Sequence, residues 1–234
     1  MDWNPSSGRV PVKFEHVEHS FPSLLQENNG DGTRCYVTPN GLKYPSVTTV
    51  LAEYSKKGID AWKKKVGEVE AEKVSRTAAQ RGTGVHKLAE DYLNNLGVPQ
   101  HGIMPNQKSV FVNLRKELDK LNKIHCLEQR LFSHELQLAG TVDCIAEYNG
   151  VLSVIDFKTS RRLKKKDQIA NYFMQGSAYA KMFSEMTGIK VEQTVIMIGV
   201  DGVDFCQVMK EDPDNHMEDL IKYINNHRER TQNG

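Results

Sequence analysis

The chain has 234 residues, of which 38% are hydrophobic and 26% charged, and its formal net charge is +1. This composition is typical of a folded globular protein, and no apolar run approaches the roughly 20 residues that span a bilayer. Because the net charge is close to zero, any attraction to a polyanion has to come from local patches of charge.

The N-terminal residues MDWNPSSGRV lack the basic and then apolar layout of a signal peptide, and their early acid argues against a transit peptide. We therefore expect a cytoplasmic protein without membrane attachment. None of the cysteines, Cys35, Cys126, Cys144 and Cys206, forms a Cys-x-x-Cys pair. The sequence thus indicates neither a zinc knuckle nor an iron–sulfur cluster.

Clusters of turn-forming residues punctuate positions 1–45, among them NPSSG, ENNGDGT and TPNG. They predict an irregular N-terminal region with at most one hairpin, followed by a single domain over 46–234. The start of that domain, SVTTVLAEYS, is ambiguous. Ser46 could cap a helix, but the β-branched residues that follow weaken the helical prediction.

Helical spacing of apolar residues dominates from about residue 60 to 96, with a break predicted near RGTG at 81–84. The elements predicted after it, in chain order, are a helix around 110–121, strands at about 126–133, 140–148 and 151–158, a helix over about 167–187 closed by Gly188, two strands around Asp201-Gly202, and a helix over about 213–228. This order predicts a mixed α/β domain.

The stretch VLSVIDFKTS, residues 151–160, is an apolar strand that carries Asp156 and Lys158 on one face, because they are two positions apart. Asn149-Gly150 before it is a strong signal for a two-residue hairpin turn. Counted outward from that turn, Asp143 faces Asp156. Two facing carboxylates repel each other, and a divalent cation between them, Mg²⁺ or Mn²⁺, would reverse that cost.

An exposed strand face with scattered charges is the alternative interpretation of this pair. The other residues on the same face, Ile145, Leu152 and Val154, are apolar. Because a face suited to burial carries two acids and a lysine, the pattern favours a metal site.

Several motifs carry a family resemblance. GTVD (140–143) followed by VIDFKTS (154–160) resembles the PD-(D/E)xK nuclease superfamily, in its RecB-like exonuclease branch. RGTGVH (81–86) is similar to that branch's helix motif with a metal-binding histidine, here His86, and Gln175 and Tyr179 match its Gln-x-x-x-Tyr motif. YPSVTTVL and the stretch from 134 to 160 are most similar to organellar genome-maintenance exonucleases. Since a transit peptide is not seen, we expect a phage or bacterial relative.

The resemblance implies a restriction-endonuclease-like core and hydrolysis of DNA phosphodiester bonds. Its catalytic residues would be Asp143, Asp156 and Lys158, and the metal ligands would be His86, both aspartates and the main-chain carbonyl of Phe157. Taken alone, His86 is more often a capping or solvent-facing residue. Gln175 and Tyr179, four apart on one helix face, would contact the nucleic acid; the alternative is an ordinary amphipathic helix.

Further candidates lie outside these motifs. In RRLKKK, Arg161, Arg162 and Lys164 would hold phosphates, unless the run is only a solvated loop. In WKKK, Trp62 would stack on bases of a single strand, unless it packs in the core. Glu135, preferred over Glu128, would support a metal ligand.

The sequence therefore predicts a Mg²⁺- or Mn²⁺-dependent DNA exonuclease that prefers single-stranded DNA or DNA ends, in replication, recombination or repair. The alternatives are a double-strand-specific recombination exonuclease, a structure-specific endonuclease, a catalytically silent DNA-binding subunit, and a phosphatase for small molecules. The three catalytic residues disfavour the silent subunit, and the basic runs disfavour the phosphatase.

Overall fold

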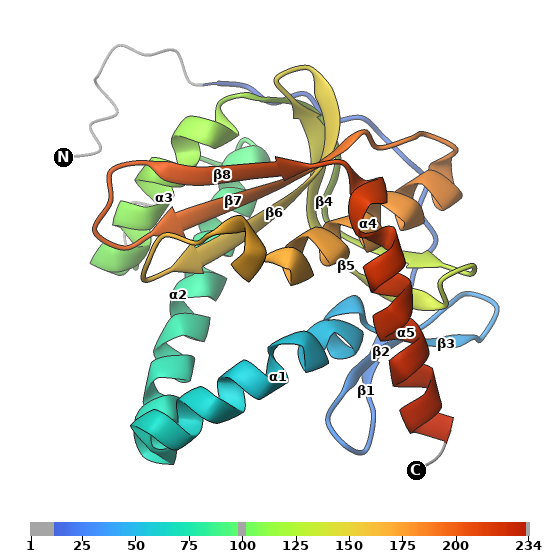
Figure 1. Cartoon of the computed structure of the whole chain (residues 1–234). Helices are drawn as coiled ribbons and strands as arrows, with labels where there is room; N and C mark the ends of the chain where they lie inside the picture. Colours follow the sequence, from blue (N-terminus) through green and yellow to red (C-terminus); the bar gives the residue numbers. More distant parts are fainter. Residues whose placement is uncertain (1–11, 98–101, 233–234) are drawn as a thin grey trace.

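A five-stranded mixed sheet forms the centre of the computed structural model, which describes residues 12–97 and 102–232 (Figure 1). Its strands lie side by side in chain order; β6 and β7 are parallel, and the other neighbouring pairs are antiparallel. They are β4 (Leu121–Ser133), β5 (Leu138–Tyr148), β6 (Val151–Ser160), β7 (Gln193–Val200) and β8 (Cys206–Glu211). The strands predicted in these regions are confirmed.

Helices flank this sheet on both faces, which confirms the mixed α/β class. One face packs against α2 (Glu68–Leu93) and α3 (Pro105–Leu118). The other packs against α4 (Ala170–Thr187), with α5 (Met217–Gln232) outside it. Two short 3-10 helices, Lys166–Gln168 and Pro213–His216, precede α4 and α5. None of the helices in the described part of the chain is long and apolar enough to cross a membrane.

The N-terminal region is more regular than predicted. β1 (Leu25–Asn28), β2 (Arg34–Val37) and β3 (Lys43–Pro45) form a three-stranded antiparallel sheet, so the expectation of at most one hairpin was wrong. Two of the turn-forming clusters each close a hairpin, with Gly32 and Gly41 at positive φ. Turn signals therefore marked the connections between strands rather than irregular chain.

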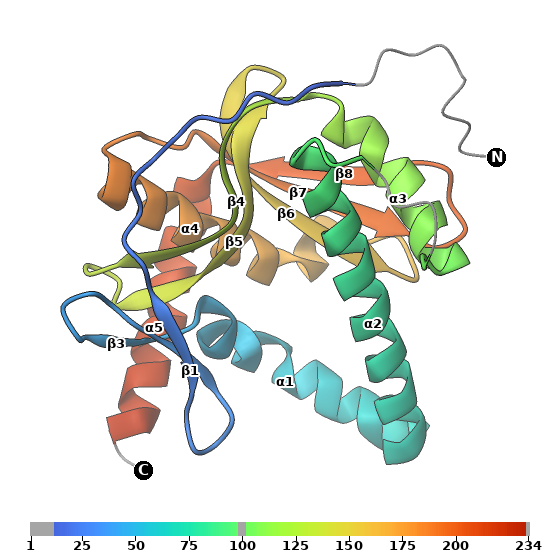
Figure 2. The ribbon, with the colours of Figure 1, turned by 180° about the vertical axis from the view of Figure 1, so that it is seen from behind.

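Before β1, residues 12–24 form a strap along the outer strand β4, and Figure 2 shows this segment in blue as it passes the sheet. Ile124 exchanges main-chain hydrogen bonds of 2.8 Å with Glu15 and Val17. His19 and His125 contact each other through ring nitrogens 2.8 Å apart. The strap thus adds a short parallel bridge to the edge of the sheet.

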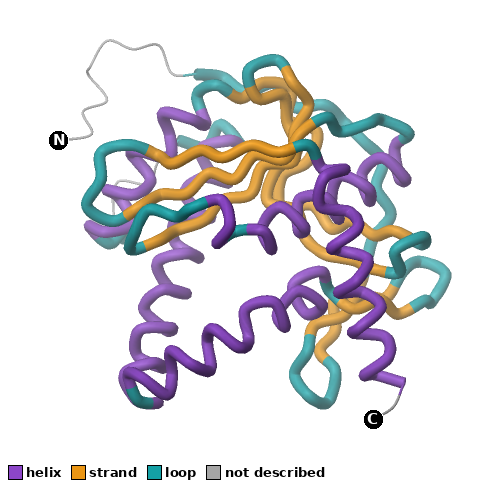
Figure 3. Tube along the Cα trace, in the orientation of Figure 1, coloured by secondary structure: helices purple, strands orange, loops and turns teal. Residues whose placement is uncertain are grey.

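The helix α1 (Val47–Val66) begins at SVTTVLAEYS, which resolves the ambiguity of that stretch. The Ser46 hydroxyl accepts the Thr49 N–H at 3.0 Å, as an N-cap does. Beyond Leu51, α1 buries none of its side chains. Figure 3 shows α1 and the first half of α2 projecting from the sheet as a helical arm.

The break predicted at RGTG was wrong, because α2 runs through residues 81–84 and the chain turns earlier, at Gly67, whose φ is 85°. Gly84 has a packing role instead. A Cβ at this position would lie 2.2 Å from the end of the Gln107 side chain, so Gly84 leaves room for Gln107 to lie against α2, where its amide donates to the Gln80 carbonyl at 3.2 Å.

The turn at Asn149-Gly150 joins β5 and β6 in the predicted register, in which Tyr148 pairs with Val151 and Cys144 with Ile155. After β6 the chain enters α4, which Gly188 closes in the left-handed conformation, as predicted. The strands β7 and β8 and the helix α5 follow in the expected order.

Candidate active site

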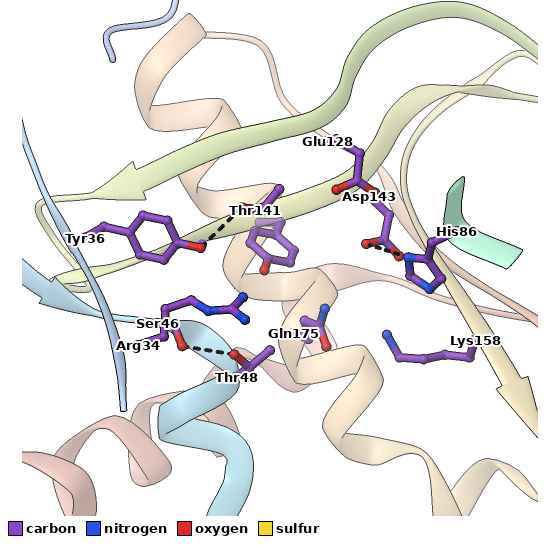
Figure 4. A pocket seen from close by; sticks show the side chains of 12 residues that line it. Arg34, Tyr36, Ser46, Thr48, His86, Glu128, Thr141, Asp143, Lys158 and Gln175 are labelled. Atoms are coloured by element: carbon purple, nitrogen blue, oxygen red, sulfur yellow. Dashed lines mark hydrogen bonds and ion pairs between the residues drawn. The ribbon is translucent and has the colours of Figure 1, made fainter. Parts of the chain in front are cut away.

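A cavity of about 260 Å³ lies where β4, β5 and β6 meet α2, α4 and the N-terminal sheet (Figure 4). Polar side chains from all of these elements line it. The acids come from the central sheet, His86 from α2 and Gln175 from α4, while Arg34 of β2 points in from the opposite wall. The fold thus gathers residues that are up to 145 positions apart in the chain, from Arg34 to Tyr179.

Glu128 and Asp143 face each other across β4 and β5, since they lie between the paired positions Leu127–Cys144 and Gln129–Val142. Together with His86 they form a cluster in which one ligand atom of each residue lies within 4.8 Å of the others. Burial and the neighbouring Asp143 carboxylate raise the pKa of Glu128 to about 7. Two acids at this separation destabilise the site unless a proton or a cation lies between them.

His86 is held by contacts on both ring nitrogens. Its Nε2 lies 2.6 Å from the carbonyl oxygen of Phe157, and its Nδ1 lies 3.6 Å from Oδ1 of Asp143. The imidazole therefore donates to the main chain of β6 through one nitrogen and presents the other toward the acids. A histidine oriented in this way is suited to bind a metal.

Asp156 is 2% exposed and lies behind the cavity wall, where it contacts the lining residues Lys158 and Gln175. Its Oδ1 accepts Lys158 Nζ at 2.5 Å and Gln175 Nε2 at 3.0 Å. Burial raises the pKa of the Asp156 carboxyl to about 6, while the Lys158 ammonium acts in the opposite direction. For Lys158, burial disfavours the charged form, but the carboxylates of Asp156 and Asp143 outweigh it and raise the pKa.

The donor atoms fit a divalent cation. Within the described ranges, Oδ2 of Asp156 is buried and has no hydrogen-bond partner, and such an orphaned oxygen is costly. Carboxylate and carbonyl oxygens with one imidazole match the preferences of Mn²⁺ or Mg²⁺. The residues able to hold the ion are Glu128, Asp143, Asp156, His86 and Phe157 through its carbonyl.

The direct pairing expected between Asp143 and Asp156 is not formed. The β5–β6 ladder ends one step earlier, at Cys144 and Ile155. Oδ2 of Asp143 instead accepts the Phe157 N–H at 2.8 Å. The acid that faces Asp143 across the sheet is therefore Glu128, from the other neighbouring strand.

Both residues of the Gln-x-x-x-Tyr motif line the cavity from α4. Gln175 contacts Asp156, as described above. Tyr179 is buried and lies over Gly140, where a Cβ would come within 2.7 Å of the phenol oxygen. Gly140 of GTVD therefore makes room for the tyrosine beside the acids.

The other predicted residues lie away from the cavity. Arg161, Arg162 and Lys164 are not among its lining residues, because the loop is tied to β8: the Lys164 main chain exchanges hydrogen bonds of 2.9 and 2.8 Å with the Gln207 side chain. Trp62 lies on the projecting part of α1. Glu135, preferred in the sequence analysis, lies in the β4–β5 turn and pairs with Lys181 at 2.6 Å.

Sequence reasoning missed the contributions of β2 and the start of α1 to the cavity, which are Arg34, Tyr36, Ser46 and Thr48. It also preferred Glu135 over Glu128, although Glu128 is the acid that lines the cavity. Counting outward from the β4–β5 turn would have paired Glu128 with Asp143, but that connection has no two-residue signal to fix the register.

Comparison with known proteins identifies related sequences. The family model described as PD-(D/E)XK nuclease superfamily matches residues 106–234, which include Glu128, Asp143, Asp156, Lys158 and Gln175. His86 and Arg34 lie outside this match.

Curated relatives extend the similarity. Mitochondrial genome maintenance exonuclease 1 of Mus musculus is 26% identical over 165 residues, which cover 63% of this chain and 48% of that protein. Its counterpart from Xenopus tropicalis is 28% identical over 177 residues, 70% of this chain and 48% of the other. The human protein is 27% identical over 133 residues. The matched part of this chain spans about half the length of the first two relatives.

Proposed function

The chain belongs to the PD-(D/E)XK nuclease superfamily, and on this premise we propose that it is a metal-dependent DNA exonuclease that prefers single-stranded DNA or DNA ends, in replication, recombination or repair. The helix-flanked mixed sheet agrees with the restriction-endonuclease-like fold of that superfamily. The relatives named above carry the word exonuclease in their names, and this supports the finer proposal.

One observation carries the proposal: Glu128, Asp143 and His86 converge to within 4.8 Å at the same cavity that Lys158 lines. Ligands for a divalent ion and a cation for the substrate are the two components that phosphodiester hydrolysis needs. A silent DNA-binding subunit has no need to keep two facing acids, Glu128 and Asp143, whose repulsion costs stability.

The chemistry follows from these positions. A bound Mg²⁺ or Mn²⁺ supplies Lewis acidity and lowers the pKa of a coordinated water. Asp156 holds the Lys158 ammonium, so that Nζ can stabilise the negative charge that grows on the phosphate oxygens during attack. Gln175 fixes the same oxygen of Asp156 from the other side. The lysine is thus preorganised before the substrate arrives.

The opposite wall is suited to the substrate. The Arg34 guanidinium points into the cavity in Figure 4, where it can hold a phosphate next to the cleaved one. The N-terminal sheet and α1 stand across from the acids, so a strand has to pass between the two walls. This supports the preference for a single strand or an end over an intact duplex.

The test uses linear single-stranded, linear double-stranded and circular single-stranded DNA, each with Mg²⁺, Mn²⁺ or chelator. Cleavage of linear single strands with metal, release of mononucleotides or short fragments from one end, and survival of the circle are expected. Cutting of the circle would make the enzyme an endonuclease, and activity in chelator would refute metal dependence. Asp156→Asn is the control for a contaminating nuclease.

A further inference from the structure

Arg81, the first residue of the RGTG segment, is a buried cation outside the cavity. It is 6% exposed, although it lies on a helix whose preceding nine residues contain none that is buried. Its NH1 donates to Oδ2 of Asp201 in the β7–β8 turn, and its Nε donates to the Thr159 hydroxyl at 3.3 Å. A single side chain thus joins α2 to two separate parts of the sheet.

Both contacts lead to the active site. Thr159 directly follows Lys158 on β6, and the Asp201 N–H donates to the carbonyl of Ser160 at 2.9 Å. His86 lies five residues after Arg81, about 7.5 Å further along the helix axis. Arg81 therefore connects the strand that carries Lys158 to the helix that carries His86.

We propose that Arg81 is a positioning residue, which with Asp201 and Thr159 sets the place of His86 relative to Asp143 and Lys158. This inference rests on the proposed function, in which His86 holds the metal. The need for such an anchor follows from the fold. The first half of α2 projects with α1 as the helical arm, so movement of the arm would displace His86 unless α2 is fixed just before it (Figure 1).

The geometry requires an arginine rather than a lysine. The planar guanidinium donates to Asp201 and Thr159 at the same time. A lysine ammonium could keep the ion pair with Asp201 but could not also donate to the Thr159 hydroxyl. Removing a contact made directly to a metal ligand typically changes metal affinity or activity by about 10–100-fold. Arg81 contacts Thr159 and Asp201 rather than a ligand, so the lower end of that range is expected.

The test measures Mn²⁺ affinity of chelator-treated protein by calorimetry, together with Tm and single-turnover cleavage. Arg81→Lys should weaken Mn²⁺ binding about tenfold and slow cleavage, with DNA affinity in chelator unchanged. Thr159→Val, which removes only the hydroxyl, should act in the same direction and carries the test if Arg81→Lys fails to fold. Arg76→Lys, the same exchange at an exposed position of α2, is the matched control.

Unchanged Mn²⁺ affinity in both Arg81→Lys and Thr159→Val, whatever their Tm, would overturn the inference. Arg81 would then only stabilise the fold. His86→Ala separates the two proposals. If His86→Ala weakens Mn²⁺ binding and the Arg81 and Thr159 variants do not, only the positioning role fails. If His86→Ala has no effect either, the assignment of His86 as a ligand fails, and the positioning role fails with it.

Discussion

The Asp143 carboxylate accepts the main-chain N–H of Phe157 at 2.8 Å, just beyond the last main-chain pair between β5 and β6, Cys144 and Ile155. A side chain therefore takes the place of a strand carbonyl, and the acid is fixed to the rigid sheet. Its other oxygen is left to face His86. This contact orients the carboxylate before any ligand binds, which is the condition for an effective metal site.

Removing the charge of Asp143 should have opposite effects on activity and on stability. Asp143→Asn can keep an acceptor for the Phe157 N–H but removes one of two facing charges. We expect cleavage to fall at least a hundredfold, as for loss of a main electrostatic group, while Tm in chelator stays equal or rises because the repulsion with Glu128 is gone. Asp204→Asn, an exposed acid in the β7–β8 turn, should change neither quantity.

Lys158→Ala should reduce the single-turnover rate by on the order of a hundredfold. Its Nζ is the cation bound to Asp156, so the loss should fall on the chemical step, with little change in DNA affinity. Rapid quench with saturating enzyme measures the step directly. Lys190→Ala, an exposed lysine near the start of β7, is the comparison; a parental rate in Lys158→Ala would make Lys158 structural.

Arg34 and the loop of residues 161–166 are two alternative sites for contact with the phosphates of the DNA. Arg34 lines the cavity and Arg161 does not, so Arg34→Gln should flatten the slope of log K against log salt by about 0.7, the value for one contact to a single strand. Arg161→Gln should leave the slope as it is. The assay is binding of a labelled single-stranded oligonucleotide in chelator across a salt series. The reverse result would place the strand over the loop.

Metal-free protein should lose stability as pH rises. The pKa of Glu128 in the folded state, about 7, lies above its ordinary value of 4.5, so folding takes up a proton between these values. The stabilisation is complete below about pH 4.5 and is lost as pH passes through 7. Partly buried histidines such as His125 have a lowered pKa and act in the opposite direction. The quantity to measure is therefore the difference in Tm between the parent and Glu128→Gln in chelator, and adding Mn²⁺ should make this difference smaller.

Two glycine-to-alanine exchanges should have opposite signs. A Cβ at Gly176 of α4 would lie 2.2 Å from the buried Thr194 side chain, so Gly176→Ala should destabilise by about 1–3 kcal/mol through overpacking. A Cβ at Gly58 of α1 meets nothing within 4 Å, so Gly58→Ala should stabilise by about 0.5–1 kcal/mol. Urea unfolding measures both. Equal effects would contradict the close packing of α4 on β7.

The sequence was sufficient for the central sheet because its signals are local. Asn149-Gly150 fixes the β5–β6 register, and the apolar periods give the helices around it. Local patterns failed at RGTG, where α2 continues through both glycines and Gly84 makes room for Gln107 of α3. They also failed over residues 12–45, where the turns were visible and the pairing partners were not.

The candidate site divides in the same way. Asp143, Asp156 and Lys158 are visible in one hairpin. Glu128 depends on the register of β4 and β5, which no two-residue turn signal fixes, and Arg34 depends on a separate sheet packed across the cavity. Such residues are brought together by tertiary contacts that no spacing rule records. Glu135 lies two positions after the end of β4 at Ser133, in the turn, where the alternation of strand faces cannot be counted.

The strap along β4 has a consequence for association. An outer strand with free N–H and C=O groups is a template for pairing with another chain, and proteins commonly cover such edges. Here Ile124 is already bonded on both its N–H and its carbonyl to residues 15 and 17, while Arg130 is tied to the carbonyl of Leu24. The segment before β1 therefore covers part of the β4 edge and hinders the addition of a strand from another molecule there. The other outer strand of the sheet is β8.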